Sequence, residues 1–293
     1  MRLFKVVVSR LSIAAIVSTV AACGGVPNYQ VIPKINKPVS HKIGNETRIP
    51  HPNHMTRYLD NDQTIVYTQN FGGGGVGVGL LGPFGVAANM SMIEENTKAD
   101  ALKLKGKISV DVNAIYKSIL NDNKGLSQDS GSDAAATITP VIDVVKVSDD
   151  KVGISTGLTV DYNPAKIAWK GRYRYKLASD YSLSGIAKGW TEEQKDAFKK
   201  SVIEGFRAVT KLYQDDVNKR LVKIRDIKFK SEFTSPRFNF DQMGHEIGGS
   251  ADRIYIRSFG LVLSLLRQSV VITDNTQPVK KKDNEDQVKE NWE

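Results

Sequence analysis

The chain of 293 residues has a single cysteine, Cys23. One cysteine excludes an intramolecular disulfide framework and a metal site built from several cysteines. No apolar run reaches the roughly 20 residues that a helix needs to cross a bilayer, which excludes a polytopic membrane protein. The Gly-x-Ser-x-Gly signature of many hydrolases is also missing. With 40% hydrophobic and 25% charged residues, however, the chain has enough apolar side chains to bury a core.

The N-terminus has the three parts of a secretory signal. Arg2 and Lys5 give it a positive start, an apolar run covers residues 11–20, and small residues close it. The sequence Val-Ala-Ala-Cys at residues 20–23 resembles the bacterial lipobox, in which the cysteine receives a diacylglycerol and the leader is cut off. This resemblance implies that residues 1–22 are a lipoprotein signal peptide and that Cys23 is lipidated. The alternative is an ordinary secretory signal with a chance cysteine near its end.

Lipidation would place the protein in the cell envelope. In enteric bacteria an aspartate after the cysteine retains a lipoprotein in the inner membrane, and the chain has Gly24 there instead. We therefore expect a lipid-anchored protein on the periplasmic face of the outer membrane. Without the three basic residues of the leader, 38 Lys and Arg stand against 32 Asp and Glu, and this net charge of +6 favours contact with anionic head groups or an acidic polymer. Because the export signal takes the chain away from DNA, we expect no nucleic-acid partner.

Composition divides the rest of the chain into three parts. Residues 23–60 contain five scattered prolines and no sustained apolar period, which predicts a flexible tether. Residues 273–293 are highly charged and predict a disordered tail. Residues 61–272 between them predict a single folded domain.

Local patterns predict an α+β fold for this domain, with an antiparallel sheet and one long packed helix. The helix begins at Thr191, which forms a capping-box pattern with Gln194, and continues with an apolar stripe as far as Leu221. Asp111 predicts the cap of a shorter helix. Strands are predicted at residues 63–71, Thr137–Val147, Val152–Tyr162, Lys166–Ser179, Val222–Phe229, Arg253–Ser258 and Leu261–Ile272.

A glycine-rich block at residues 72–85 joins the first of these strands to a helix that starts at residue 86 and ends near residue 105. We expect a strand, glycine-rich turn and helix unit there. Residues 102–112 also fit a strand period, so the sequence leaves helix and strand open. The block belongs to a stretch without charge between Asp62 and Glu94. We predict that it is a contact surface for an envelope protein, a second copy of the chain or the membrane, and the alternative is a close-packed turn. The contact residues would be Val76, Val78, Leu80 and Leu81.

Several short motifs resemble known cofactor, metal or polyanion sites, but the residues around them argue against such sites. Residues 77–82 read Gly-x-Gly-x-x-Gly, but Pro83 follows directly and the later strands do not form βαβ repeats, so we predict no cofactor. His51 and His54 lie in the predicted tether without a further ligand, so we predict no metal site. His245-Glu246 begins like a zinc-protease helix but has no second histidine. Residues 170–176 alternate basic and aromatic side chains, which is typical of a strand with one solvated face; the alternative is a polyanion-binding surface.

Three pieces of the chain resemble uncharacterised lipoproteins of Gram-negative bacteria. They are the lipobox at Cys23, the strand and glycine block at residues 67–90, and the closing stretch at residues 253–267. The resemblance carries no catalytic residues. Because no acid–base, nucleophile or metal set is evident, we predict a non-enzymatic envelope protein of the binding or assembly type. The alternative is a periplasmic small-ligand carrier or enzyme with a pocket near the glycine-rich block.

Overall fold

The computed structural model describes residues 32, 40–44, 55–70, 82–123, 126–128, 136–162, 169–236 and 240–274. Within these residues the protein is mixed α+β, and its sheet of twelve strands is mostly antiparallel. The class predicted from the sequence is therefore confirmed. Cys23, the contact residues Val76, Val78, Leu80 and Leu81, and the pair His51 and His54 lie outside the described residues.

Three long strands form the centre of the sheet. They are β5 (Ala136–Lys146), β6 (Lys151–Tyr162) and β7 (Trp169–Ser182), each antiparallel to the next. They confirm the three predicted strand-like runs to within a few residues, because Val, Ile, Thr and Tyr side chains suit the pleated surface of a sheet. A short helix, α4 (Leu183–Lys188), follows β7.

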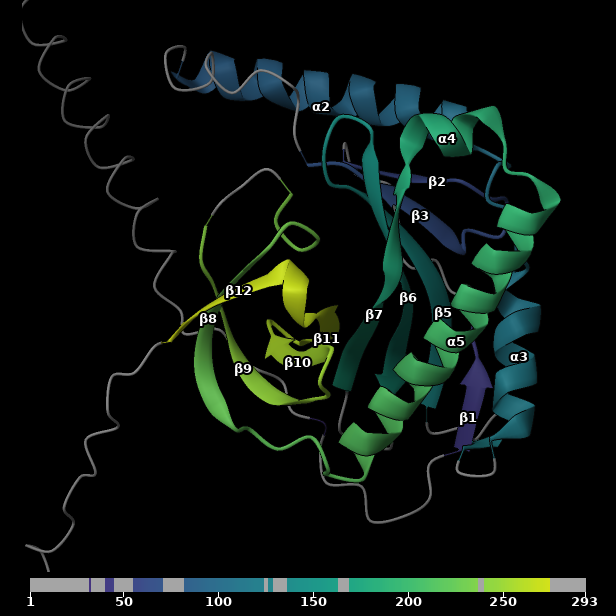
Figure 1. Cartoon of the computed structure of the whole chain (residues 1–293), viewed down its shortest axis with the longest axis vertical. Helices are drawn as coiled ribbons and strands as arrows, with labels where there is room; N and C mark the ends of the chain where they lie inside the picture. The colour runs from purple at the N-terminus through teal and green to yellow at the C-terminus, as the bar shows by residue number, and fades with distance from the viewer. Residues whose placement is uncertain are drawn as a thin grey trace, which may run out of the picture.

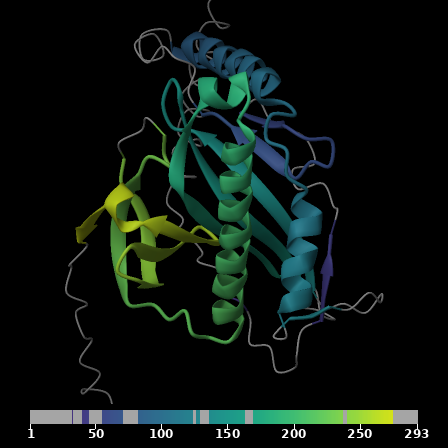
Figure 2. The same cartoon turned by 45° about the vertical axis from the view of Figure 1, so that its right-hand side comes forward.

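Helix α5 (Glu192–Val217) lies across one face of β6 and β7, as Figures 1 and 2 show. Its predicted capping box is confirmed: the Gln194 N–H donates to Thr191 Oγ1 over 3.3 Å, and the Thr191 N–H donates to Gln194 Oε1 over 2.9 Å. Gly205 allows a close approach to the sheet, because an added Cβ would come within 2.7 Å of Thr156 Oγ1. The buried apolar stripe consists of Phe198, Val202, Phe206, Val209, Leu212 and Tyr213.

Elements from the N-terminal half extend and cover this sheet. Strand β3 (Ile65–Thr68) runs parallel to β5, and β2 (Thr56–Tyr58) pairs with β3. Helix α3 (Val112–Asp122) lies beside α5 on the same face and is capped by Asp111, as predicted. Helix α2 (Gly82–Leu104) has 23 residues and corresponds to the helix predicted from residue 86 to about residue 105, although it begins four residues earlier. With α5 at 26 residues, the described part of the chain contains two long helices.

The segment 102–112, which fits both a helical and a strand period, contains the end of α2 and a turn. Helix α2 ends at Leu104. Gly106 follows with a φ of +70°, a left-handed conformation that glycine adopts without strain and that commonly ends helices. Leu104 and Ile108 are both buried, which accounts for the apolar spacing that mimicked a strand.

The predicted tether at residues 23–60 is wrong for the parts that the structure describes. Strand β1 (Ser40–Ile43) pairs in parallel with β5 and with β4 (Ser127–Gln128), β2 belongs to the sheet, and Ile32 is only 2% exposed. These segments are short and polar. Strand β1 gains its hydrogen bonds from partners far along the chain, and β2 pairs with the nearby β3, so the composition of these segments does not reveal them.

The C-terminal strands continue the sheet in the order β12, β8, β9, β10 and β11. The predicted strands at Val222–Phe229 and Arg253–Ser258 are confirmed to within a few residues, but the predicted strand Leu261–Ile272 is two strands separated by a 3-10 helix. Strand β9 has no predicted counterpart, because its glycines interrupt the apolar pattern. The last strand continues two residues into the predicted tail. The bounds are β8 (Arg225–Ser231), β9 (Gln242–Gly249), β10 (Arg253–Ser258), β11 (Leu261–Leu266), a 3-10 helix at Arg267–Ser269, and β12 (Val270–Asp274).

The two halves of the sheet meet where β11 runs parallel to β7. Leu261 pairs with Arg172 and Ser264 pairs with Tyr175. We call this junction the seam. The pair Asp216 and Arg257, with Tyr173, reinforces it from the side of α5.

In this cluster, Arg257 Nη2 donates to Asp216 Oδ1 over 2.6 Å and Nη1 donates to Asp216 Oδ2 over 3.2 Å. The Tyr173 hydroxyl donates to Asp216 Oδ2 over 2.8 Å. Burial and then the charge of Asp216 raise the pKa of Tyr173 well above its ordinary value, so the phenol keeps the proton that it donates. The cluster thus joins α5, β10 and β7.

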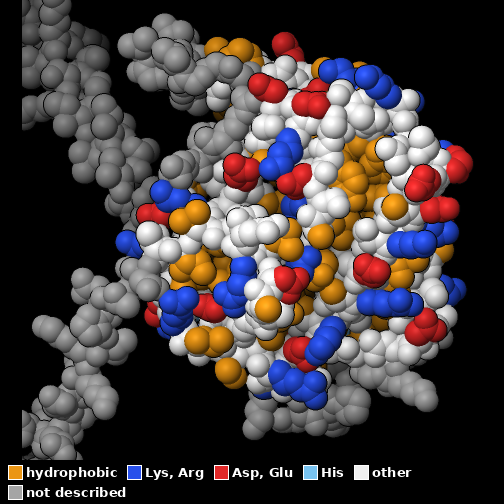
Figure 3. Space-filling model, viewed as in Figure 1, with side chains coloured by type: hydrophobic (Ala, Val, Ile, Leu, Met, Phe, Trp, Pro, Cys, Tyr) orange, Lys and Arg blue, Asp and Glu red, His pale blue; other side chains and the backbone are white. Residues whose placement is uncertain are grey.

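The surface carries charges of both signs. Figure 3 shows one face, on which basic and acidic side chains are interspersed with apolar ones. Exposed apolar side chains on α2 include Met90, Met92 and Leu102. Among the helices that the structure describes, none is both long and apolar enough to cross a membrane.

Candidate functional site

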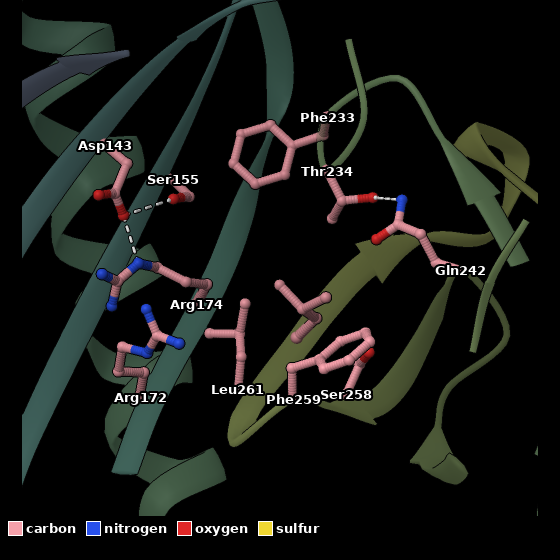
Figure 4. Close-up of a pocket in the computed structure, with 11 residues that line it drawn as sticks. Asp143, Ser155, Arg172, Arg174, Phe233, Thr234, Gln242, Ser258, Phe259 and Leu261 are labelled. Carbon is pink, nitrogen blue, oxygen red and sulfur yellow. Dashed lines mark hydrogen bonds and ion pairs between the residues drawn. The ribbon is translucent and has the colours of Figure 1, made fainter. Parts of the chain in front are cut away.

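A pocket of about 240 Å³ lies between the central strands and the C-terminal strands. Figure 4 shows its arrangement: charged side chains from β5 and β7 form one wall, and residues from the loop after β8 and from β9 to β11 form the others. We call it the paired-arginine pocket. Its lining residues are Asp143, Ser155, Arg172, Arg174, Phe233, Thr234, Gln242, Ser258, Phe259, Leu261 and Leu263.

Strand periodicity places the two arginines side by side. Residues two apart in a strand point to the same face, so Arg172 and Arg174 share one face of β7, whereas Tyr173 points to α5 on the other. Asp143 faces the pocket from β5, between Ile142 and Val144, which are buried in the core below α5. The sheet therefore presents an apolar face to α5 and a charged face to the pocket.

Arg174 is fixed in this wall. Its Nε forms an ion pair with Asp143 Oδ2, and its Nη1 donates to the carbonyl oxygens of Tyr173 over 3.0 Å and Leu158 over 3.4 Å. Ser155 Oγ donates to the same carboxylate oxygen of Asp143 over 3.3 Å. Gly157 makes room for the guanidinium, because a Cβ there would come within 2.5 Å of Arg174 Nη1.

Arg172 stands beside this ion pair, and none of the described residues pairs with it. The residue is exposed, and no hydrogen bond or ion pair joins its side chain to another residue within the described ranges. Partial burial of the group and then the like charge of Arg174 lower the pKa of Arg172, while Asp143 opposes this effect. An arginine stays charged at neutral pH even so. The wall therefore carries two positive charges and one negative charge.

The remaining walls are apolar or neutral. The ring of Phe233 faces the arginines from one side, and Leu261 and Phe259 lie on another. On the far side, Gln242 Nε2 donates to Thr234 Oγ1 over 2.7 Å. The polar atoms of that pair thus partly satisfy each other, and the surplus charge lies at one end of the pocket only.

The prediction of a solvated strand face is wrong for Lys176, the third basic residue on this face of β7. It is 5% exposed, and its Nζ donates to Asp180 Oδ1 over 2.7 Å and to the Leu177 carbonyl over 2.9 Å. Burial lowers the pKa of Lys176, and Asp180 opposes this effect. The C-terminal strands fold over this face, with Phe233 next to Lys176. A strand's own sequence does not show which later segment covers it.

A second hollow, of about 880 Å³, lies on the other side of Phe233. Its charged side chains are compensated: Lys151 pairs with Asp180 at 3.0 Å and with Glu232 at 3.4 Å, and Lys230 lies 3.8 Å from Asp241. Lys176 pairs with Asp180 as well. The hollow thus lacks the one-sided charge that distinguishes the paired-arginine pocket.

Other motifs from the sequence do not converge on a site. His245 and Glu246 lie on strand β9 rather than on a helix, where His245 Nδ1 is 2.6 Å from Asp226 Oδ1 and Glu246 pairs with Arg225. No cluster of three or more metal-binding side chains occurs among the residues that the structure describes. Of the Gly-x-Gly-x-x-Gly motif only Gly82 is described, at the start of α2.

The sequence indicated part of this pocket. Alternation predicts that Arg172 and Arg174 share one strand face, but it does not predict a role for Asp143 or Gly157. A signal for Asp143 exists, because it is the single charge within the apolar strand Val141–Val145. A lone carboxylate in such a run indicates a buried or half-buried partner of opposite charge.

Comparison of the chain with protein-family models, with curated proteins and with solved structures gives no match.

Proposed function

We propose that this chain is a lipid-anchored, non-enzymatic binding protein of the bacterial cell envelope, and that it binds its ligand at the paired-arginine pocket. The observation that carries the proposal is the position of Arg172. Its guanidinium stands at a pocket beside the pair Arg174 and Asp143, and no other described residue neutralises it. Two like charges held together favour the arrival of an anion.

The membrane anchor is the second part of the proposal. Cys23 follows a leader with a lipobox, and Gly24 follows the cysteine, which supports a protein held at the periplasmic face of the outer membrane. The diacylglycerol would tie the N-terminus to the bilayer, while the folded body faces the periplasm.

The uncharged segment before α2 forms the third part. We propose that the glycine-rich block at residues 72–85 contacts an envelope protein or a second copy of the chain. Support comes from the described part of α2, where Met90 and Met92 continue the uncharged stretch and are 41% and 39% exposed. Exposed apolar side chains on the helix next to the block support a contact in this region.

The alternative function is a periplasmic small-ligand carrier or enzyme that uses a pocket near the glycine-rich block. Such a carrier or enzyme would keep its ligand-binding ability when Arg172 is replaced, and an enzyme would also convert the bound molecule. The variants below therefore distinguish it from the proposal.

The binding function is tested with lipidated protein extracted from membranes in a mild detergent. Native mass spectrometry should show a non-covalent small-molecule adduct. The variant Arg172→Gln should lose most of it, because the unpaired charge is gone. Lys170→Gln is the matched control, since Lys170 is on the same strand but pairs with Asp161 at 3.0 Å outside the pocket. Equal occupancy in all three proteins, or no adduct at all, would contradict the proposal.

The anchor is tested by replacing Cys23 with serine. Cells grown with radiolabelled palmitate should label the parent protein, and Cys23→Ser should lose the label and leave the membrane fraction. Ser18→Ala, a change within the same leader, should keep both. A Cys23→Ser protein that still sediments with membranes and carries the label would overturn this part.

A further inference from the structure

We infer that the paired-arginine pocket takes a small amphiphile: an oxyacid group, either a carboxylate or a phosphate ester, on a short apolar stem. The inference rests on the proposed binding function and adds the chemical class of the ligand. Charge, donor geometry, the apolar walls and the pocket's volume each support it.

The charge distribution favours an anion at one end of the pocket. Asp143 Oδ2 is already engaged by Arg174 Nε and by Ser155 Oγ. Asp143 acts on Arg172 only through attraction at longer range. Of the two cations, one is therefore paired and one is not. A single oxyacid group would complete the balance.

Donor geometry favours an oxyacid over a simple halide ion. A guanidinium is planar and presents its N–H groups as a fork, which matches two oxygens of a carboxylate or phosphate. Arg174 uses Nε and Nη1 within the protein, whereas its Nη2 has no hydrogen bond to the described residues. That atom and the fork of Arg172 are the donors left for a ligand. Because Arg174 is held by backbone carbonyls, little entropy is lost when the ligand binds.

The walls beyond the arginines favour an apolar stem. Phe233, Phe259, Leu261 and Leu263 line the pocket away from the charged wall. The neutral polar groups have partners in the protein: Gln242 donates to Thr234, and Ser258 Oγ donates to the Met243 carbonyl over 2.6 Å. These neutral groups do not require a second charged group on the ligand. An apolar stem would remove these rings and methyl groups from water.

The volume limits the ligand to a small molecule. At about 240 Å³ the pocket lies below the range of roughly 300–1,000 Å³ that is typical for drug-sized ligands. A stem of about six carbons is consistent with this size, whereas a nucleotide or a polymer segment is not.

Defined probes test the ligand class. Lipidated full-length protein in dodecyl maltoside is titrated with hexanoate, hexyl phosphate, acetate, inorganic phosphate and hexanol by isothermal calorimetry. One of the hexyl anions should bind about tenfold or more tightly than its short counterpart, because each buried methylene adds to affinity. Hexanol should bind far more weakly than either. The tighter hexyl anion identifies the oxyacid as carboxylate or phosphate.

Two variants separate the contributions. Arg172→Gln should weaken the hexyl anions by about tenfold to a hundredfold, the loss expected for hydrogen bonds to a charged group, and Lys170→Gln should not. Phe259→Asn should remove part of the preference for the hexyl stem and leave acetate and phosphate unaffected. Phe259 has a φ of +47°, and asparagine tolerates this left-handed backbone better than most residues, so the turn should persist.

Two results would overturn the inference. One is hexanol binding as tightly as the hexyl anions, and the other is hexyl anions binding no better than acetate and phosphate. In either case, the native mass spectra decide what remains of the proposal. If the parent protein carries a small-molecule adduct that Arg172→Gln loses, the binding function stands and only the ligand class is wrong. If the parent protein carries no adduct, the binding function and the ligand class both fail.

Discussion

At the scale of single residues, Asp216 and Arg257 carry opposite charges where water hardly reaches. Their side chains are 2% and 4% exposed, and two hydrogen bonds join them. Removing an ion from water costs several kcal/mol, which the attraction between the partners and the hydrogen bond from Tyr173 offset. Loss of one partner should therefore be more harmful than loss of both.

We expect Arg257→Met to lower the free energy of unfolding by about 3–5 kcal/mol, because Asp216 would stay buried without its partner. The double variant Arg257→Met with Asp216→Leu should recover part of this loss. Unfolding in guanidinium chloride, followed by circular dichroism, measures both. Lys170→Met, at an exposed pair, should change stability by less than about 1 kcal/mol. Equal losses in the single and double variants would show that the buried charge is not the cause.

Residue patterns predicted the direction of side chains at the site but not their surroundings. Alternation in β7 correctly put Arg172, Arg174 and Lys176 on one face. It did not show that Lys176 is buried, because the covering residue Phe233 comes from a loop far along the chain. The pocket itself was not predicted, since its walls come from segments that only the tertiary fold brings together.

At the scale of elements, α5 depends on a cap that its own sequence specifies. We expect Thr191→Ala to lower the free energy of unfolding by about 0.5–2 kcal/mol, because the Gln194 N–H loses its acceptor. Thermal or urea unfolding measures the change. Ser201→Ala serves as the control, since its hydroxyl only donates to a carbonyl one turn back in the same helix. A loss of the same size in the control would contradict a role for the cap.

Elements with strong local signals were predicted, and those that depend on distant partners were not. The capping box of α5, the cap of α3 and the apolar strands β5 and β6 are readable within a few residues. Strand β1 is polar and short, and it exists because β5 offers an edge. Strand β9 contains glycines that suppress its pattern but form hydrogen bonds with β8 and β10 all the same.

At the scale of the whole molecule, one sheet carries both the body of the protein and the pocket. The strands β8 to β12 form a group of antiparallel neighbours, and the seam between β11 and β7 attaches this group to the centre. On the side of α5 the cluster of Asp216, Arg257 and Tyr173 reinforces the seam. On the other side lies the paired-arginine pocket, with walls from both halves of the sheet.

The seam also sets the order in which the protein becomes able to bind. Segments far apart in the sequence must first be brought together, and closing so long a loop is entropically unfavourable and slow. We therefore expect the pocket to form late in folding, after Leu261 has paired with Arg172. A ligand bound across the two halves would lower the rate of unfolding without raising the rate of folding.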